Sequence, residues 1–158
     1  MSRAPFQVLV LPYRRCSNGT VEYALFRRAD RDAWQGIAGG GQGLETPNAA
    51  AVRELFEEAN ITPTEPLVGL ASLGAIPVEH FRDRESWPPE LETIPEYAFG
   101  VDVGYQPIRL SAEHVSMQWM SFSDAHARLT WESNRAALRE IGVMVVRGLA
   151  GMWVLGVI

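Results

Sequence analysis

The spacing of apolar residues in the first forty positions is typical of β-strands. Residues 7–13 form a compact apolar run, and residues 21–28 alternate between apolar and polar side chains. A turn-forming Ser-Asn-Gly segment at 17–19 separates the two runs, so they are predicted to pair as a β-hairpin. A shorter apolar segment at 34–38 runs directly into three consecutive glycines.

After the glycines, the apolar period changes from that of a strand to that of a helix. Thr46 is a favourable N-cap residue, and Pro47 suits the first helical position. Apolar residues then follow at i, i+3, i+4 and i+7, which predicts an amphipathic helix. The residues expected on its packing side are Val52, Leu55, Phe56 and Ala59.

The rest of the chain combines further strands with two more helices. The predicted segments are strands at 67–78, 94–103 and 115–122, a short helix capped by Ser123, and a longer helix at 133–146. The polar, proline-containing segment 79–92 is predicted to be a long loop, and loops of this length often carry function. Strands with interspersed helices predict an α/β fold, a mixed sheet with helices packed on it.

Length and composition favour one domain, residues 1–158, with a sizeable core. The chain has 158 residues, of which 47% are hydrophobic. A formal net charge of -5 argues against nucleic acid as a partner, because sequence-independent binding needs a basic surface. The single cysteine, Cys16, excludes an internal disulfide, and the N-terminus lacks a signal-peptide pattern, so we expect a cytoplasmic protein.

The longest apolar run is at the C-terminus, in residues 141–158. It contains Arg147 and four glycines, and its length is at the short end of what a membrane span requires. We therefore expect no membrane contact. The run is interpreted as a tail that packs on the domain or forms a homodimer.

The predicted helix carries three closely spaced glutamates. At about 100° per residue, Glu54, Glu57 and Glu58 fall together opposite the apolar side, with Arg53 at the border. By themselves, these carboxylates fit either a solvated acidic face or a site for a hard cation. Mg²⁺ prefers oxygen ligands and completes its shell with substrate phosphates.

The spacing of residues upstream of the glutamates decides between these two interpretations. Eight of nine fixed positions agree with the pattern G-x5-E-x7-R-E-U-x-E-E-x-G-U, where U is aliphatic. The matching residues are Gly39, Glu45, Arg53, Glu54, Leu55, Glu57, Glu58 and Ile61. This pattern is the Nudix box, so the chain resembles the Nudix hydrolases over residues 39–61. The one departure is Asn60 in place of glycine, and Asn tolerates the left-handed conformation expected at the helix end.

The resemblance implies a Nudix fold, in which a mixed β-sheet is sandwiched between helices (α/β/α). It also implies a hydrolase in which water attacks phosphorus with the help of Mg²⁺, for which Mn²⁺ can substitute. Glu57 and Glu58 are then metal ligands, and Glu54 is either a ligand or the base that activates water. Arg53 is expected to orient a neighbouring carboxylate. The glycine-rich segment 39–43 is expected to turn tightly and bring Glu45 towards the helix.

Beyond the box, the chain resembles the branch of dihydroneopterin triphosphate pyrophosphatases, also called dATP pyrophosphohydrolases. The resemblance is carried by residues 26–30, 34–35, 113–114, 119 and 133–135. It implies that Glu113 and Gly39 belong to the metal site, and that Arg27, Arg3 and Ala38 contact the substrate. The expected substrate is dATP, another nucleoside triphosphate or dihydroneopterin triphosphate, cleaved to the monophosphate and pyrophosphate.

The loop at 79–92 does not resemble that branch, so the choice of substrate stays open. Phe81, Trp87 and Tyr97 either stack on a base or pterin ring or pack in the core. The three histidines, His80, His114 and His126, have no ligand spacing and are interpreted as structural or surface residues.

Three other functions compete with this prediction. ADP-ribose pyrophosphatases carry a proline sixteen residues past the box, where this chain has Pro77. Dinucleoside polyphosphate hydrolases usually have Pro-Lys-Gly-His in the glycine loop, which residues 38–43 lack. A catalytically inactive Nudix-like nucleotide sensor typically loses box glutamates, whereas all three are present in this chain.

Overall fold

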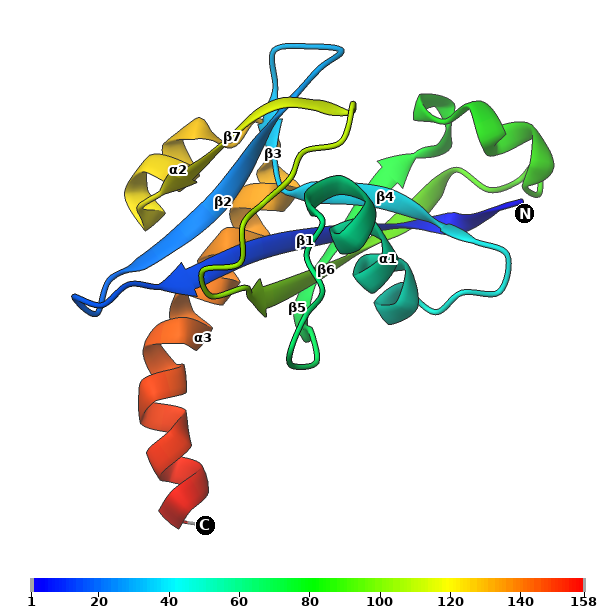
Figure 1. The fold of residues 1–158 in the computed structure, drawn as a ribbon. Coiled ribbons are helices and arrows are strands. Elements are labelled where there is room, and N and C mark those ends of the chain that lie inside the picture. The colour runs from blue at the N-terminus through cyan, green and yellow to red at the C-terminus, as the bar shows by residue number, and fades with distance from the viewer. Residues whose placement is uncertain (1, 158) are drawn as a thin grey trace.

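The computed structural model describes the chain over residues 2–157, with side chains described up to residue 147. Its centre is a seven-stranded sheet with helices on both faces (Figure 1). The strands are β1 (Arg3–Arg15), β2 (Val21–Arg28), β3 (Trp34–Gln35), β4 (Ile37–Gln42), β5 (Val68–Pro77), β6 (Thr93–Asp102) and β7 (His114–Met120). The α-helices are α1 (Pro47–Ala59), α2 (Phe122–Arg128) and α3 (Glu132–Val157).

The sheet is mixed, as the sequence predicts. The strands follow the order β3-β2-β1-β6-β5, with β4 paired to β1 and β7 paired to β2. β1 is parallel to β6 and antiparallel to β2 and β4. The predicted β1–β2 hairpin is present, and its turn contains Gly19 at φ 85°, a conformation that favours glycine.

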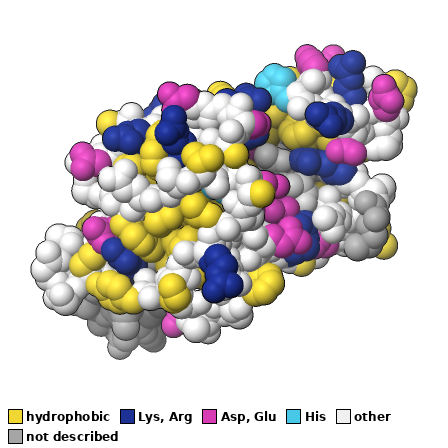
Figure 2. Space-filling model, turned by 45° about the horizontal axis from the view of Figure 1, so that its top comes forward, with side chains coloured by type: hydrophobic (Ala, Val, Ile, Leu, Met, Phe, Trp, Pro, Cys, Tyr) yellow, Lys and Arg dark blue, Asp and Glu magenta, His cyan; other side chains and the backbone are white. Residues whose placement is uncertain are grey.

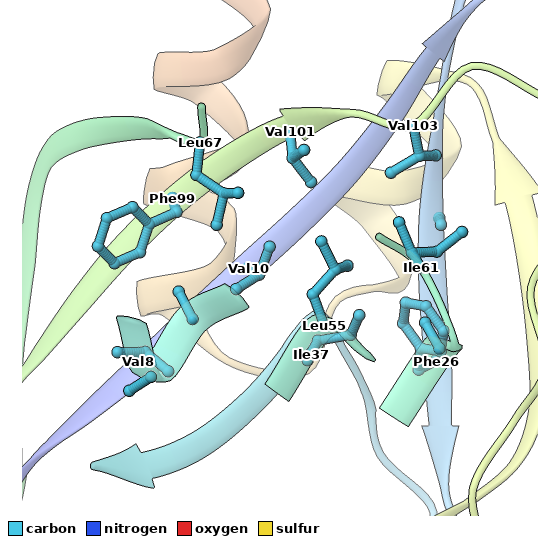
Figure 3. Packing of buried hydrophobic residues seen from close by; sticks show 14 residues of the cluster. Val8, Val10, Phe26, Ile37, Leu55, Ile61, Leu67, Phe99, Val101 and Val103 are labelled. Atoms are coloured by element: carbon cyan, nitrogen blue, oxygen red, sulfur yellow. The ribbon is translucent and has the colours of Figure 1, made fainter. Parts of the chain in front are cut away.

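Alternation along β1 divides the core into two layers. Val8 and Val10 point to the α1 side, where they pack with Phe26, Ile37 and Leu55 (Figure 3). The intervening leucines, Leu9 and Leu11, point to the other side, into the core beneath α2 and α3. A fully buried side chain of this size contributes about 1.5–3 kcal/mol, so the two layers hold the helices on opposite faces of the sheet.

Both predicted ends of α1 are confirmed. The Thr46 side chain accepts a hydrogen bond from the backbone N–H of Ala49 at 3.2 Å, so Thr46 is the N-cap. Asn60 adopts φ 57° and ψ 33° at the C-cap, the left-handed conformation that the Nudix box assigns to glycine. Its backbone N–H donates to the Phe56 carbonyl oxygen at 2.9 Å.

The predicted packing side of α1 is right for Leu55 and Ala59, which are buried, but wrong for Phe56 and for two of the glutamates. Phe56 is 55% exposed, whereas Glu54 and Glu58 are 9% and 2% exposed, and Glu57 is exposed. The buried arc of the helix is built from Ala50, Ala51, Leu55 and Ala59, and the two glutamates lie inside it. Small alanines leave room beside the sheet for two carboxylates. A prediction based on hydrophobicity alone therefore rotates the helix away from its observed orientation.

The glycine-rich segment 39–43 turns as predicted and brings Glu45 to Arg53 of the helix, and the turn lies at the end of the segment. Gly39, Gly40 and Gly41 lie in the extended strand β4, and the only positive φ in this segment, 55°, is at Gly43. The tight turn therefore falls after the triplet.

Smaller differences concern the ends of elements. The N-cap of α2 is Ser121, whose side chain accepts from the Asp124 N–H at 3.2 Å, so the predicted cap at Ser123 is wrong. The predicted loop at 79–92 contains two short 3-10 helices, η1 (Val78–His80) and η2 (Arg82–Ser86).

Helix α3 continues through the apolar C-terminal run, but whether that run packs or dimerises depends on side chains outside the described residues. Among the described residues, no helix combines the length and apolarity needed to cross a membrane.

Candidate active site

Gly39 on β4 and Glu54 on α1 are in direct contact. A Cβ atom at Gly39 would lie 2.2 Å from the carboxyl carbon of Glu54, so only glycine lets this carboxyl group lie against the strand. The next two glycines accommodate other side chains in the same way, Gly40 the guanidinium of Arg3 and Gly41 the ring of Phe6. The triplet is needed for the close approach of three side chains to β4.

Arg53 connects three of the four box glutamates. Its Nε and Nη2 donate to the Glu45 carboxylate at 2.9 and 3.0 Å, and its Nη1 donates to Glu54 at 2.9 Å and to Glu57 at 3.2 Å. Nη2 also donates to the carbonyl oxygen of Gly40 at 2.8 Å. These hydrogen bonds lower the pKa of Glu45 and raise the pKa of Arg53. Arg53 thus fixes Glu54 and Glu57 relative to β4.

Glu58 is the most deeply buried acid of the box. Its Oε1 lies 3.7 Å from Nδ1 of His114. Its Oε2 is buried and has no hydrogen-bond partner among the described residues, and the same is true of His114 Nδ1. Buried polar atoms normally have partners, so an unpartnered carboxylate oxygen points to a group that binds there.

Burial controls the ionisation of this acidic cluster. It raises the pKa of Glu58 far above its usual range, and the neighbouring carboxylates of Glu113 and Glu54 raise it further. Burial also raises the pKa of Glu54, although the hydrogen bond from Arg53 opposes that shift. The pKa of His114 is lowered by burial. Positive charge supplied from outside the chain would relieve the cost of these buried carboxylates.

The acidic cluster does not enclose a cation site by itself. No three acidic, cysteine or histidine side chains among the described residues stand close enough together to hold a metal ion. The Glu57 carboxylate, with a half-exposed side chain, is held by Arg53 instead. Oxygen donors on one side only, with the rest left to solvent or substrate, are what a phosphate-bound Mg²⁺ requires.

Arg3 approaches the glycine triplet from the start of β1. Its guanidinium lies against Gly40 and 4.7 Å from the ring centre of Phe81, and it donates to Gln7 Oε1 at 2.5 Å. Burial lowers the pKa of Arg3, which nearby Asp83 and Glu54 partly offset. Arg3 is therefore a half-buried cation close to the acidic cluster.

The three candidate stacking residues have different environments. Trp87 is 6% exposed, and its Nε1 donates to the Arg3 carbonyl oxygen at 2.9 Å, so it is a packing residue. Phe81 meets Trp87 edge-on at 5.7 Å and is partly exposed. Tyr97 is 37% exposed and meets Phe6 edge-on at 6.0 Å.

The remaining predicted substrate contacts, Arg27 and Ala38, have different surroundings. Arg27 is exposed on β2 and pairs with Asp32 at 3.3 Å. Ala38 precedes the glycine triplet on β4, opposite Leu9 of β1, and is half-buried. The structure thus brings Arg3 close to the cluster, but places Arg27 in a surface ion pair.

Two residues near the cluster were not assigned to it from the sequence. His114 packs 5.3 Å from the ring of Phe26 in addition to its contact with Glu58. Arg28 donates twice to Asp30 at 2.7 Å and lies near enough to Glu113 and Glu58 for their charges to raise its pKa. Both fall within the short motifs shared with the pyrophosphatase branch, which was the available signal. The other two histidines, His80 and His126, are at the surface as expected.

One hollow on the described surface lies away from the box glutamates. It measures about 570 Å³ and is lined by β7 and α2 residues such as Trp119 and Asp124, without any box glutamate. The space-filling view instead shows acidic and basic side chains gathered together in a recess near the middle of the molecule (Figure 2). Size alone does not identify a site, so the buried carboxylates are kept as the candidate site.

Known proteins share this fold. The NUDIX domain model matches residues 9–141. The dihydroneopterin triphosphate diphosphatase of Haemophilus influenzae is 29% identical over 137 residues, covering 84% of each chain. A solved structure assigned to the NUDIX hydrolases, from Listeria monocytogenes, superposes with a TM-score of 0.82 at 32% identity, over 92% of this chain and 97% of that one.

A third comparison supports the fold alone. The dihydroneopterin triphosphate pyrophosphohydrolase structure from E. coli superposes with a TM-score of 0.70 at 24% identity, covering 87% of this chain and 94% of that one. The family match spans most of the chain, and the box residues gather around one buried acidic cluster. The chain therefore belongs to the NUDIX domain family and is a Nudix hydrolase.

Proposed function

We propose that this Nudix hydrolase is a Mg²⁺-dependent pyrophosphohydrolase that acts on a nucleoside-triphosphate-like substrate. The candidates are dATP, another nucleoside triphosphate and dihydroneopterin triphosphate, with the monophosphate and pyrophosphate as products. The single observation that carries the proposal is Glu58, whose buried Oε2 has no partner among the described residues while two further carboxylates lie beside it. The Haemophilus influenzae relative adds support for the pterin substrate.

The proposed ligands are the box glutamates together with two groups from outside the helix. They are Glu54, Glu57, Glu58, Glu113 and the main chain of Gly39. When bound, Mg²⁺, or Mn²⁺ in its place, would neutralise charge on the phosphate oxygens and supply a bound hydroxide near neutral pH. Arg53 orients Glu54 and Glu57, so it is a positioning residue in this proposal.

The chain's own groups would also move the proton and hold the phosphate. One of the three box glutamates accepts a proton from the attacking water, with Glu54 as the candidate fixed best in place. Arg3 is the candidate cation for the phosphate chain, because its guanidinium lies beside the glycine triplet. Ala38, just before the triplet on the same strand, is a candidate substrate contact, and Arg27 is a weaker one because Asp32 already pairs with it.

Compartment and assembly are also proposed rather than observed. A single cysteine suits a reducing cytosol, so we propose a cytoplasmic enzyme. The apolar C-terminal run makes a homodimer our proposed assembly.

The test is a substrate screen with product identification. Purified protein is incubated with dNTPs, dihydroneopterin triphosphate, ADP-ribose and dinucleoside polyphosphates, in Mg²⁺ or in EDTA. We expect pyrophosphate and a monophosphate from a triphosphate, in Mg²⁺ only. AMP and ribose phosphate from ADP-ribose as the main products would overturn the substrate class.

Two variants separate the site from the fold. Glu58→Gln should lower turnover by several orders of magnitude, whereas Glu65→Gln, the same change at an exposed position before β5, should leave it unchanged. If no substrate is cleaved in any divalent metal but nucleotides still bind, the chain is a sensor and the enzyme proposal fails.

A further inference from the structure

A third buried carboxylate lies on the opposite face of the sheet from α1. Glu96 on β6 is 6% exposed, and it borders a pocket of about 260 Å³ between β5, β6 and the first turns of α3. The pocket is lined by Ser72, Gly74, Glu96, Ala98, Ser133 and Ala136. Its volume is below that of pockets for whole drug-sized ligands, so it suits one flat ring system rather than an entire nucleotide.

The residues around Glu96 leave its carboxyl group available to a ligand. A Cβ atom at Gly74 would lie 3.3 Å from the Glu96 Cβ, so the glycine leaves space over the carboxyl group. Burial raises the pKa of Glu96, and only the Ser133 hydroxyl opposes the shift. A buried acid with so little support from the protein gains most from a ligand that donates hydrogen bonds.

The strand register connects this pocket to the proposed phosphate site. Glu96 is opposite Gln7 on β1, and Gln7 is opposite Gly40 on β4. Residues opposite one another point to the same face, and two strand spacings amount to about 10 Å. Gly40 accommodates Arg3, which in turn donates to Gln7. The sugar and first phosphate of a nucleotide can bridge such a distance, with the ring at Glu96 and the phosphates beside Arg3.

Carboxylate chemistry limits which ring fits best. A carboxylate has two acceptor oxygens, so its natural partner is an edge with two adjacent N–H donors. A 2-amino-4-oxopyrimidine ring, shared by guanine and pterin, presents a ring N–H next to an amino group. Adenine presents one donor beside one acceptor. Gln7 must turn its oxygen towards Arg3, which leaves its NH₂ as a donor for the ring oxo group.

We propose that Glu96 is a specificity-determining residue that binds the ring N–H and 2-amino edge of a guanine or pterin ring. The inference rests on the proposed function for the position of the phosphates, and it narrows the substrate class to triphosphates of 2-amino-4-oxopyrimidine rings. The small pocket and the buried Glu96 carboxylate lie on the same face of the sheet as Gln7 and Gly40, where Arg3 is bound.

The wild-type test uses product nucleotides, so that it does not depend on turnover. The dissociation constants of GMP, IMP, XMP and AMP are measured in EDTA. IMP lacks the 2-amino group, and XMP replaces it with an oxo acceptor. GMP is expected to bind about tenfold to a hundredfold more tightly than the other three, because a hydrogen bond to a charged group is lost in each. GMP and IMP affinities within twofold of each other, or no measurable binding, would overturn the proposal.

The second test uses a variant in which one acceptor oxygen of Glu96 is replaced by an NH₂ donor. Glu96→Gln provides one acceptor and one donor, which complements the xanthine edge, so the preference should shift from GMP to XMP by tenfold or more. Glu92→Gln, the same change at an exposed position just before β6, should keep the wild-type order. A thermal melt establishes that Glu96→Gln is folded. If it is folded and retains the preference for GMP, the inference fails, whether or not Glu58→Gln abolishes hydrolysis.

Turnover measurements then distinguish a guanine substrate from a pterin substrate. Hydrolysis of dihydroneopterin triphosphate and GTP is compared with that of dATP and a pyrimidine triphosphate. A higher kcat/KM for dihydroneopterin triphosphate identifies a pterin site, and a higher value for GTP identifies a guanine site. A higher value for dATP or the pyrimidine triphosphate contradicts the role of Glu96 while leaving the hydrolase proposal intact.

Discussion

The carboxyl group of Glu54 lies against the α-carbon of Gly39, where a Cβ atom would come within 2.2 Å of it. The contact joins the strand and the helix of the Nudix box, and Arg53 holds the same carboxylate from the other side. The position of Glu54 therefore depends on a missing side chain as much as on a hydrogen bond.

Gly39→Ala should damage activity far more than stability. Glu54 must move, and since its carboxyl group ends a flexible side chain, it can do so without disturbing the core. We expect turnover to fall at least a hundredfold, while the free energy of unfolding changes by less than about 1 kcal/mol.

Gly69→Ala is the matched control for this change. A Cβ atom at Gly69 would meet Phe99 at 3.9 Å, an ordinary contact, so both activity and stability should stay close to wild type. Assays and urea denaturation of the two variants decide the question. Wild-type turnover in Gly39→Ala would show that the position of Glu54 is unimportant.

Metal should stabilise the wild-type fold through Glu58. A ligand at a hundred times its dissociation constant contributes about 2.7 kcal/mol, which corresponds to several degrees in the melting temperature of a chain this size. Glu58→Gln should lose most of that shift. It should also melt at or above the wild-type temperature in EDTA, because it removes a buried carboxylate that lacks a partner among the described residues.

The measurement is a thermal melt in Mg²⁺ and in EDTA, with Glu65→Gln as the control. An equal Mg²⁺ shift in wild type and Glu58→Gln would remove Glu58 from the ligand set. This readout is independent of turnover, so it tests the cation site even before the substrate is known.

Glu96 should make stability depend on pH in a direction set by its burial. Burial raises its pKa in the folded chain, so between the ordinary glutamate pKa and the raised value the folded state retains a proton that the unfolded state has lost. The contribution of Glu96 to the free energy of unfolding therefore falls as the pH rises through this window, and it is constant below the ordinary value.

Glu96→Gln should remove that slope. The variant is expected to equal the wild type in stability near pH 4 and to exceed it near neutral pH. Urea denaturation of both proteins across this range provides the test, with exposed Glu92→Gln as the control. Parallel curves for wild type and Glu96→Gln would show that the Glu96 carboxyl group ionises as freely in the folded chain as in the unfolded one.

The sequence predicted the elements of this fold better than the directions of their side chains. Strand alternation and the Thr46 and Asn60 caps are local signals, and the structure confirms them. The orientation of α1 is a tertiary property. Glu54 and Glu58 are buried because alanines beside them make room near β4, and hydrophobic periodicity instead favoured Phe56, which is exposed.

In the candidate site, too, local contacts were predictable from the sequence and long-range contacts were not. The spacing of the box brought Glu45, Arg53 and Glu54 into one network, because sequence distance within a strand–turn–helix unit limits spatial distance. The contact of His114 with Glu58 joins segments more than fifty residues apart, and no local pattern encodes it. Glu96 was missed for a related reason, since a single acid in an apolar strand has no partner in the sequence to draw attention to it.

The C-cap of α1 provides a test of stability alone. Asn60 holds φ 57°, a backbone conformation that is strained for a residue with a Cβ atom and unstrained for glycine. Asn60→Gly should therefore raise the free energy of unfolding by up to about 1 kcal/mol, and Asn60→Ala should lower it by about 1 kcal/mol. The Asn60 and Ile61 backbone N–H groups donate to the Phe56 and Leu55 carbonyl oxygens in any of the three proteins, so turnover should be unchanged. Urea denaturation beside a standard assay measures both quantities. A loss of turnover in Asn60→Gly would mean that the asparagine side chain takes part in the chemistry, contrary to its position at the far end of the helix from Thr46.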